Sequence, residues 1–169
     1  LREAAAAGSM AGLRAAEMIA RRAGVTGMIA GQTLDVTLEG TQPSLDKVGY
    51  IHAHKTADLL TAPMEAGLIL AGASEDQLVA GRTYGYHLGI AFQMVDDLLD
   101  LEGDPKQMGK NTGMDAAQGK LTWPACVGIA RTREDAAVHI RQAAEAMEAF
   151  GERGNFLKAL AQSTLTRVQ

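Results

Sequence analysis

The chain has 169 residues, of which 47% are apolar and only 4% aromatic, and its net charge is −4 at pH 7. This length fits one domain with a sizeable core, and a composition rich in Ala, Leu, Met and Gly favours helices over a β-sandwich. The negative charge excludes a global basic field, so we predict no nucleic-acid partner.

Three features bear on the setting of the chain. Cys126 is the only cysteine, which excludes an internal disulfide and fits a reducing, cytoplasmic compartment; we interpret its thiol as a small buried hydrophobe. No apolar run reaches the roughly 18 residues of a membrane span. The sequence opens without Met on LREAAAAGSMAGLRAAEMIARR, already in helical periodicity, so we expect residue 1 to lie inside a longer protein.

Helical periodicity predicts three helices in the first half of the chain, over residues 1–22, 27–38 and 44–71. Gly24 and Gly40 follow the first two and are typical helix stops. Ser44 is a candidate N-cap of the third helix. Within that helix we expect a local change of course near Lys55 and a bend or restart at Pro63.

The second half begins with the longest predicted helix, residues 74–101, in which Ser74 and Gln77 have the spacing of a capping box. A polar, glycine-rich stretch over residues 103–121 then predicts a long loop, and long loops are often functional. Further helices are expected from about residue 122, over 133–150 and over 155–167. Because no strand pattern is convincing, we predict an all-α fold, an antiparallel helix bundle.

Three aspartates gather near the end of the longest predicted helix, in AFQMVDDLLDLEGDP. Asp96 and Asp100 share one helix face, and Asp97 lies about 100° round from Asp96. Acids so close together, near a helix C-terminus, oppose one another and the helix dipole. Their apolar surroundings call for a cation, and oxygen ligands suit Mg²⁺, which binds one or two carboxylates plus a substrate phosphate. The alternative is a solvated acidic face on a helical scaffold or interaction protein.

The loop that follows supplies cations that could meet the phosphate, namely Lys106, Lys110 and Lys120. Its glycines would let backbone N–H groups approach an anion. The sequence has no Walker A pattern and no Gly-x-Gly-x-x-Gly, so it is not a nucleotide loop of those kinds. Ordinary loop solubility is the alternative for the lysines alone.

Four segments in this order resemble motifs of the trans-type isoprenyl diphosphate synthases, the farnesyl and geranylgeranyl diphosphate synthase group. They are GMIAGQTLD, IHAHKTADLL, GIAFQMVDDLLD and GDPKQMGKNTGMDAAQGKLTWP, which lie within residues 27–124. The resemblance implies an all-α prenyltransferase fold that joins an allylic diphosphate to isopentenyl diphosphate, head to tail, with Mg²⁺ as cofactor. It also implies a homodimer and, by its closeness to short-chain enzymes, a C15 or C20 product.

The resemblance also assigns roles to single residues. The implied metal ligands are Asp96, Asp97 and, more weakly or through water, Asp100. The implied diphosphate contacts are Lys55, Lys110 and Lys120. Near the reacting carbons it places the polar oxygens of Thr56 and Gln93, so that the expected catalytic set is Lys55, Thr56, Gln93 and Asp96. Gln32 and Asp35 are expected to support the site from a facing helix.

One departure limits what the chain can do. The family's first aspartate-rich motif, with the arginine pair after it, is not in this sequence, so residues 1–169 would be the C-terminal part of one prenyltransferase domain with about half of the active site. We expect such a fragment to be inactive alone. Two alternatives are a non-catalytic subunit of a partner, or a degenerate homologue that binds Mg²⁺ and pyrophosphate without turnover.

Overall fold

The computed structural model describes residues 2–102 and 113–166. Within these ranges the chain forms helices and no strand, which confirms the all-α prediction. The elements are α1 (Arg2–Ala6), α2 (Met10–Ala23), α3 (Met28–Thr37), α4 (Leu45–Ile51), the π-helix η1 (His52–Ala57), α5 (Asp58–Leu70), α6 (Glu75–Glu102), α8 (Met114–Ala117), α9 (Trp123–Val127), α10 (Ile129–Ala146), the 3-10 helix η2 (Met147–Gly154) and α11 (Asn155–Leu165).

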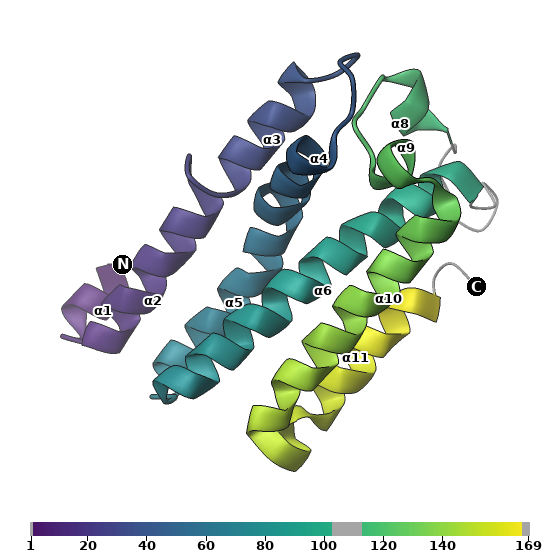
Figure 1. Cartoon of the computed structure of the whole chain (residues 1–169). Helices are drawn as coiled ribbons and strands as arrows, with labels where there is room; N and C mark the ends of the chain where they lie inside the picture. Colours follow the sequence, from purple (N-terminus) through teal and green to yellow (C-terminus); the bar gives the residue numbers. More distant parts are fainter. Residues whose placement is uncertain (1, 103–112, 167–169) are drawn as a thin grey trace.

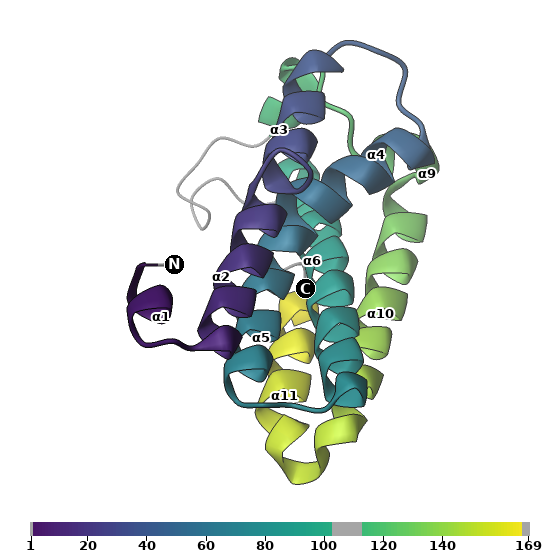
Figure 2. The ribbon, with the colours of Figure 1, turned by 90° about the vertical axis from the view of Figure 1, so that its left-hand side faces the viewer.

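The long helices run antiparallel to their neighbours (Figure 1). Helix α6 lies in the middle and packs on α5 on one side and on α10 on the other. Helices α2 and α3 cover α5 and η1 from outside, as Figure 2 shows from that side, and α11 covers α10. The short helices α8 and α9 gather at the end of the bundle where α6 ends. No helix in the described ranges is long and apolar enough to cross a membrane.

Apolar side chains from α6, α10, η2 and α11 form one core cluster, which includes Tyr84, Leu88, Ile140 and Met147. The Tyr84 hydroxyl donates to the Leu157 carbonyl at 2.9 Å, so its polar end is satisfied. Burial raises the pKa of Tyr84 to about 12, because the phenolate would be poorly solvated there. This cluster fixes α6 against the C-terminal helices.

Glycines at intervals of four residues let α6 approach α5 closely. A Cβ at Gly85 would lie 2.6 Å from the Thr61 Cα, and one at Gly89 would overlap the Ala57 Cα. Any other residue at these two positions would push the helices apart, so the contact needs glycine. The close approach continues toward the C-terminal half of α6, where the polar residues of the site lie.

The predicted first helix, residues 1–22, is wrong as one unit, because it is divided into α1 and α2. Gly8 adopts a φ of +61°, which suits glycine and interrupts helical geometry. Ser9 then caps α2, its hydroxyl accepting from the Gly12 N–H at 3.0 Å. A good local cap therefore overrode the continuous periodicity.

The change of course expected near Lys55 is present as the π-helix η1. The expected restart at Pro63 is wrong, because α5 continues through Pro63 to Leu70. Pro63 is exposed, so water can reach the carbonyl one turn earlier that lacks a partner. The extra residue of a π-turn, rather than the proline, interrupts the α-helical register here.

Two predicted caps are confirmed and several boundaries move. The Ser44 hydroxyl accepts from the Lys47 N–H at 3.4 Å, while Ser74 and Gln77 form the reciprocal pair of a capping box, at 3.3 and 3.1 Å. The helix predicted to begin at residue 133 begins at Ile129 and passes into a 3-10 segment at Met147. The predicted loop over 103–121 contains the short helix α8.

Candidate active site

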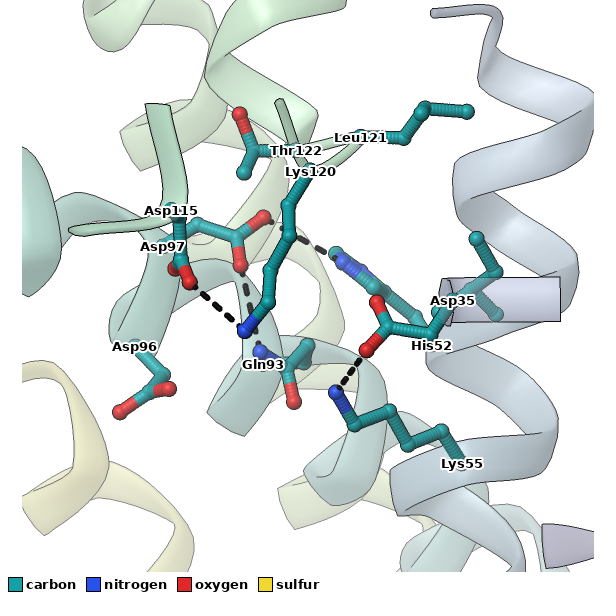
Figure 3. Close-up of a pocket in the computed structure, with 11 residues that line it drawn as sticks. Asp35, His52, Lys55, Gln93, Asp96, Asp97, Asp115, Lys120, Leu121 and Thr122 are labelled. Atoms are coloured by element: carbon teal, nitrogen blue, oxygen red, sulfur yellow. Dashed lines mark hydrogen bonds and ion pairs between the residues drawn. The ribbon is translucent and has the colours of Figure 1, made fainter. Parts of the chain in front are cut away.

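A small polar pocket lies at the end of the bundle where α3, η1 and α6 meet the segment that contains α8 (Figure 3). Its volume is about 130 Å³. The described side chains that line it come from segments far apart in sequence: Asp35, Ile51, His52, Lys55, Gln93, Asp96, Asp97, Asp115, Lys120, Leu121 and Thr122. Lys55, Gln93, Asp96, Asp97 and Lys120 were predicted for a site, and the fold brings them together.

Lys55 is held by a carboxylate of the facing helix. Its Nζ lies 2.5 Å from Asp35 Oδ2, and Asp35 is only 6% exposed. One turn before Asp35, a Cβ at Gly31 would overlap the backbone at Lys55, so glycine permits α3 to lie directly on η1. Asp35 thus lies on the facing helix in contact with Lys55, and its supporting role stays a prediction. Gln32 is exposed and is not among the residues that line this pocket.

Lys120 reaches the pocket from the segment between α8 and α9. Its Nζ contacts Asp115 Oδ1 at 3.0 Å, and Figure 3 shows the side chain extended across the pocket. Burial by itself lowers the pKa of Lys120, but the hydrogen bond and charge of Asp115, followed by Asp35 and Glu39, raise it overall. Gly119, at a φ of +67°, accepts from the Gly40 N–H at 2.7 Å and ties this segment to the α3–α4 loop.

The three aspartates of α6 lie in three different environments. Asp96 lines the pocket and is partly exposed. Asp97 is 3% exposed, and its oxygens accept from Gln93 Nε2 at 3.2 Å and from the Trp123 N–H at 2.8 Å. Asp100 is 4% exposed and accepts from the Asp115 N–H at 3.0 Å. Asp96 is thus the acid with the access that a bound ion needs, and metal binding by Asp97 and Asp100 stays a prediction.

Thr56 and Gln93 contact each other across the η1–α6 interface. The Thr56 hydroxyl donates to Gln93 Oε1 at 2.7 Å. Because its one hydrogen is used in this bond, the Thr56 oxygen can offer only lone pairs to any other group. The two residues predicted to lie near reacting carbons therefore form one polar unit.

The pocket has more negative than positive side chains. Among the described lining residues, four carboxylates face two ammonium groups: Asp35, Asp96, Asp97 and Asp115 against Lys55 and Lys120. An anion alone would meet net repulsion, whereas a divalent cation would balance the difference. Within residues 2–102 and 113–166, no three His, Cys, Asp or Glu side chains are grouped to hold a metal by themselves. A cation here would need further ligands, such as phosphate oxygens and water.

Sequence reasoning assigned no site role to His52, Asp115 or Trp123. His52 is 2% exposed, its Nε2 lies 3.3 Å from Asp97 Oδ2, and its ring stacks on Trp123 with centroids 5.7 Å apart. A signal for His52 was available, because His52 and Thr56 are four residues apart, like Gln93 and Asp97. Equal spacing on two packed helices lets two pairs of polar side chains meet. Asp115 and Trp123 gave no such signal.

Two further residues discussed from the sequence are Lys110 and Cys126. Lys110, a predicted diphosphate contact, lies outside the described residues. Cys126 is partly buried and packs against the cluster of Val48, Ile51 and Leu121. Burial, with the nearby charge of Asp97, raises the pKa of the Cys126 thiol. The thiol therefore stays protonated and behaves as a small apolar side chain.

Comparison with known proteins decides the family. The family model described as polyprenyl synthetase matches residues 4–161. The chain belongs to the polyprenyl synthetase family. Among curated polyprenyl synthetase relatives, it is 39% identical over 141 residues to geranylgeranyl pyrophosphate synthase 11 of Arabidopsis thaliana, which covers 82% of this chain and 40% of that protein. It is 40% identical over 131 residues to the farnesyl diphosphate synthase of Geobacillus stearothermophilus, which covers 78% of this chain and 44% of that protein.

Solved structures of polyprenyl synthetases give the same result. The decaprenyl diphosphate synthase of Rhodobacter capsulatus superposes with a TM-score of 0.83 at 29% identity, over 93% of this chain and 60% of that one. A Helicobacter pylori geranyltransferase, complexed with magnesium and isoprenyl diphosphate, superposes with a TM-score of 0.75 at 26% identity, over 91% of this chain and 50% of that one. The chain thus spans about two fifths of the curated relatives it matches.

Proposed function

We propose that the chain forms the C-terminal part of a prenyl diphosphate synthase that joins an allylic diphosphate to isopentenyl diphosphate, head to tail. The observation that carries the proposal is the convergence of Asp96, Lys55 and Lys120 on one pocket from three separate segments. A carboxylate with access for a cation, beside two lysines, suits a diphosphate better than it suits an uncharged substrate. Membership of the polyprenyl synthetase family supports this reading.

In this proposal Asp96 holds Mg²⁺ together with oxygens of the diphosphate. The donor set fits, because a hard cation prefers carboxylate, phosphate and water oxygens, and the lining carboxylates outnumber the lysines. When bound, Mg²⁺ stabilises the charge that develops on departing pyrophosphate. Asp97 and Asp100 were predicted as further ligands. At present they accept hydrogen bonds from the backbone N–H groups of Trp123 and Asp115, which favours roles in holding the segment after α6.

Lys55 and Lys120 bind the diphosphate by exchanging or sharing their carboxylate partners. Each ammonium group now contacts an aspartate, Asp35 and Asp115 respectively. A diphosphate with its metal brings more negative charge than one carboxylate, so it can compete for these cations. The aspartates keep both lysines turned toward the pocket before substrate arrives. Lys110 is proposed as a third contact from the loop that follows α6.

Thr56 and Gln93 serve the electron-poor end of the allylic substrate. Because the Thr56 hydrogen points to Gln93, the Thr56 oxygen offers lone pairs that favour a developing allylic cation. The isopentenyl double bond attacks that cation, and a proton is then lost. The role of Lys55 in the predicted catalytic set is to stabilise the departing pyrophosphate.

Three finer features complete the proposal. We propose a C15 or C20 product, since the relatives with about two fifths identity are named farnesyl and geranylgeranyl synthases. We also propose a homodimer, which the resemblance implies, and a cytoplasmic location, with which a single cysteine is compatible. Product length is checked by chromatography of the dephosphorylated products, and the dimer by light scattering of the full-length protein.

The central experiment uses the full-length protein with an allylic diphosphate, isopentenyl diphosphate and Mg²⁺. We expect prenyl transfer, a large loss in turnover for Asp96→Ala and a smaller loss for Asp100→Ala. Equal and small losses would remove Asp96 from the metal site. For the chain itself, Mg²⁺ with pyrophosphate should raise the melting temperature, since a ligand of the folded state stabilises it; no shift with the pair or with a bisphosphonate would contradict binding.

A further inference from the structure

The second acid of the α6 motif has a role different from the first. We infer that Asp97 is a positioning residue, which fixes the orientation of the Gln93 side-chain amide and thereby turns the Thr56 hydroxyl hydrogen away from the substrate. The geometry of this inference stands by itself, and its effect on turnover rests on the proposed prenyl transfer. It separates Asp97 from metal binding, which it leaves to Asp96.

The oxygens of Asp97 are occupied by protein donors. Oδ1 accepts from Gln93 Nε2 at 3.2 Å, and Oδ2 accepts from the Trp123 N–H at 2.8 Å and lies 3.3 Å from His52 Nε2. Two hydrogen-bond donors and one close ring nitrogen thus surround the carboxylate, which has room for roughly four hydrogen bonds. Because Asp97 is also only 3% exposed, a metal could bind it only after these contacts were broken.

An ionised carboxylate can only accept hydrogen bonds, and this decides how the Gln93 amide is oriented. Its NH₂ group must point to Asp97, and its carbonyl oxygen then points to Thr56. In the opposite orientation the amide oxygen would face the Asp97 carboxylate, with no proton between them. The Thr56 hydroxyl therefore donates to Gln93, and its lone pairs stay on the substrate side.

His52 strengthens this arrangement from the first turn of η1. Its Nδ1 is the only buried side-chain nitrogen or oxygen in residues 2–102 and 113–166 without a hydrogen-bond partner. Its other ring nitrogen, Nε2, is the one that lies toward the Asp97 carboxylate. With the ring stacked on Trp123, His52 and the Trp123 backbone contact one oxygen of Asp97, and Gln93 contacts the other. Figure 3 shows the Asp97 carboxylate facing His52 and Gln93, with Asp96 turned away from them.

The test compares Asp97→Asn with Asp96→Asn in the full-length protein. Asparagine keeps the shape of Asp97 but presents an NH₂ group where only acceptors fit, so the Gln93 amide loses its fixed orientation. For Asp97→Asn we expect kcat to fall by about ten- to a hundredfold while the half-saturating Mg²⁺ concentration stays within about twofold. For Asp96→Asn we expect the Mg²⁺ requirement to rise. A rise of the same size in Asp97→Asn would overturn the inference.

A second test does not depend on activity: NMR of glutamine-labelled protein records the signals of the Gln93 side-chain amide. These signals are assigned as those that disappear in Gln93→Leu. In the unmodified protein we expect two well-separated NH₂ resonances with slow hydrogen exchange, and in Asp97→Asn their collapse toward solvent-like values. Rapid exchange in the unmodified protein would contradict the inference even if Asp97→Asn failed to fold. Absence of prenyl transfer by the unmodified protein would instead contradict the proposed function and leave this readout intact.

Asp135→Asn is the matched control. Asp135 accepts from Trp123 Nε1 at 3.0 Å and from Arg131 at 2.7 Å, so it contacts the same tryptophan but does not line the pocket. We expect this variant to keep the amide signals of Gln93, kcat and the Mg²⁺ dependence. Loss of the Gln93 signals in Asp135→Asn would show that any change around Trp123 disturbs the amide, which would overturn the specific role of Asp97.

Discussion

The two halves of α6 use the same helix face for opposite purposes. Positions 81, 85, 89, 93 and 97 lie four residues apart, and they hold three glycines, then a glutamine and an aspartate. In the first half, Gly85 and Gly89 bring α6 against the backbone of α5 and η1. In the second half, Gln93 and Asp97 meet Thr56 and His52 of η1. One continuous helix face, which we call the seam, thus makes close backbone contacts in its first half (the glycine half, residues 81–89) and polar side-chain contacts in its second half.

The difference shows how the fold limits the free-energy cost of a buried polar cluster. Burying Asp97 beside a half-buried Gln93 is costly unless each buried polar atom finds a partner. The glycine contacts bring the helix backbones close together, and short polar side chains can then reach across. The close-packed half therefore sets the geometry of the polar half, and changes in the first should be felt in the second.

We expect the largest effect on stability from Gly89→Ala, which disrupts the glycine half of the seam. The new Cβ would overlap the Ala57 backbone, which cannot move as a flexible side chain can. We expect a loss of about 1–3 kcal/mol or more in the free energy of unfolding, measured by urea denaturation. The control is Gly67→Ala in α5, where a Cβ meets nothing within 4 Å, so this variant should be neutral or gain about 0.5–1 kcal/mol.

A smaller effect is expected from Gly31→Ala, which acts on the outer helix α3. Its Cβ would overlap the backbone at Lys55, but α3 lies at the edge of the bundle and can shift outward. The Lys55–Asp35 contact should then weaken. We expect a rise in KM for the allylic diphosphate that exceeds any change in kcat, measured by steady-state kinetics of the full-length protein. A change in kcat alone would contradict this account of Gly31.

The next effect concerns the opposite side of α6, where His87 and His139 of α10 meet with their Nδ1 atoms 2.8 Å apart. Burial, followed by the proximity of His87, lowers the pKa of His139 to about 4, although Asp135 opposes this; burial also lowers the pKa of His87. The unfolded chain, with histidine pKa near 6.5, therefore takes up protons first. The contribution of this histidine pair to the free energy of unfolding is fully present above about pH 6.5 and is lost as the pH falls toward 4.

We expect the melting temperature to fall between pH 7 and pH 4.5 by more in the unmodified chain than in His139→Gln. The glutamine can still hydrogen-bond to His87 but does not titrate. Scanning calorimetry in matched buffers measures the difference. Parallel pH profiles for the two proteins would show that the pair does not govern acid stability.

We expect the smallest effect from Gly81→Ala, which compares two positions within the glycine half of the seam. A Cβ at Gly81 would meet the Leu68 Cδ1 atom, the far end of a flexible side chain, rather than backbone. Leu68 can change rotamer, so Gly81→Ala should cost less than about 1 kcal/mol, offset in part by the better helix propensity of alanine. A loss as large as that of Gly89→Ala, in the same urea measurement, would mean that the seam tolerates no added volume anywhere.

Several elements could be predicted because their signals are local. Ser44, Ser74 and Gln77 were identified as caps from neighbours within four residues, and α6 was predicted within two residues at its ends. The failures were also local conflicts. Gly8 and Ser9 divided a periodic helix, whereas exposed Pro63 did not stop one. In each case the geometry of a single turn decided whether the helix continued.

By itself the sequence determined the all-α class, the order of the helices and the residue types of the site, because periodicity, caps and motif spacing are properties of neighbouring residues. Only the tertiary structure decided that Asp96 is partly exposed in the pocket while its neighbour Asp97 is buried in the pocket wall, and that Lys55 and Lys120 each already contact an aspartate. The physical reason is that the residues that contact Asp97, such as Trp123 and His52, lie 26 and 45 positions from it in the chain. Helix periodicity gives the direction of a side chain, but packing decides which hydrogen-bond donors lie within its reach.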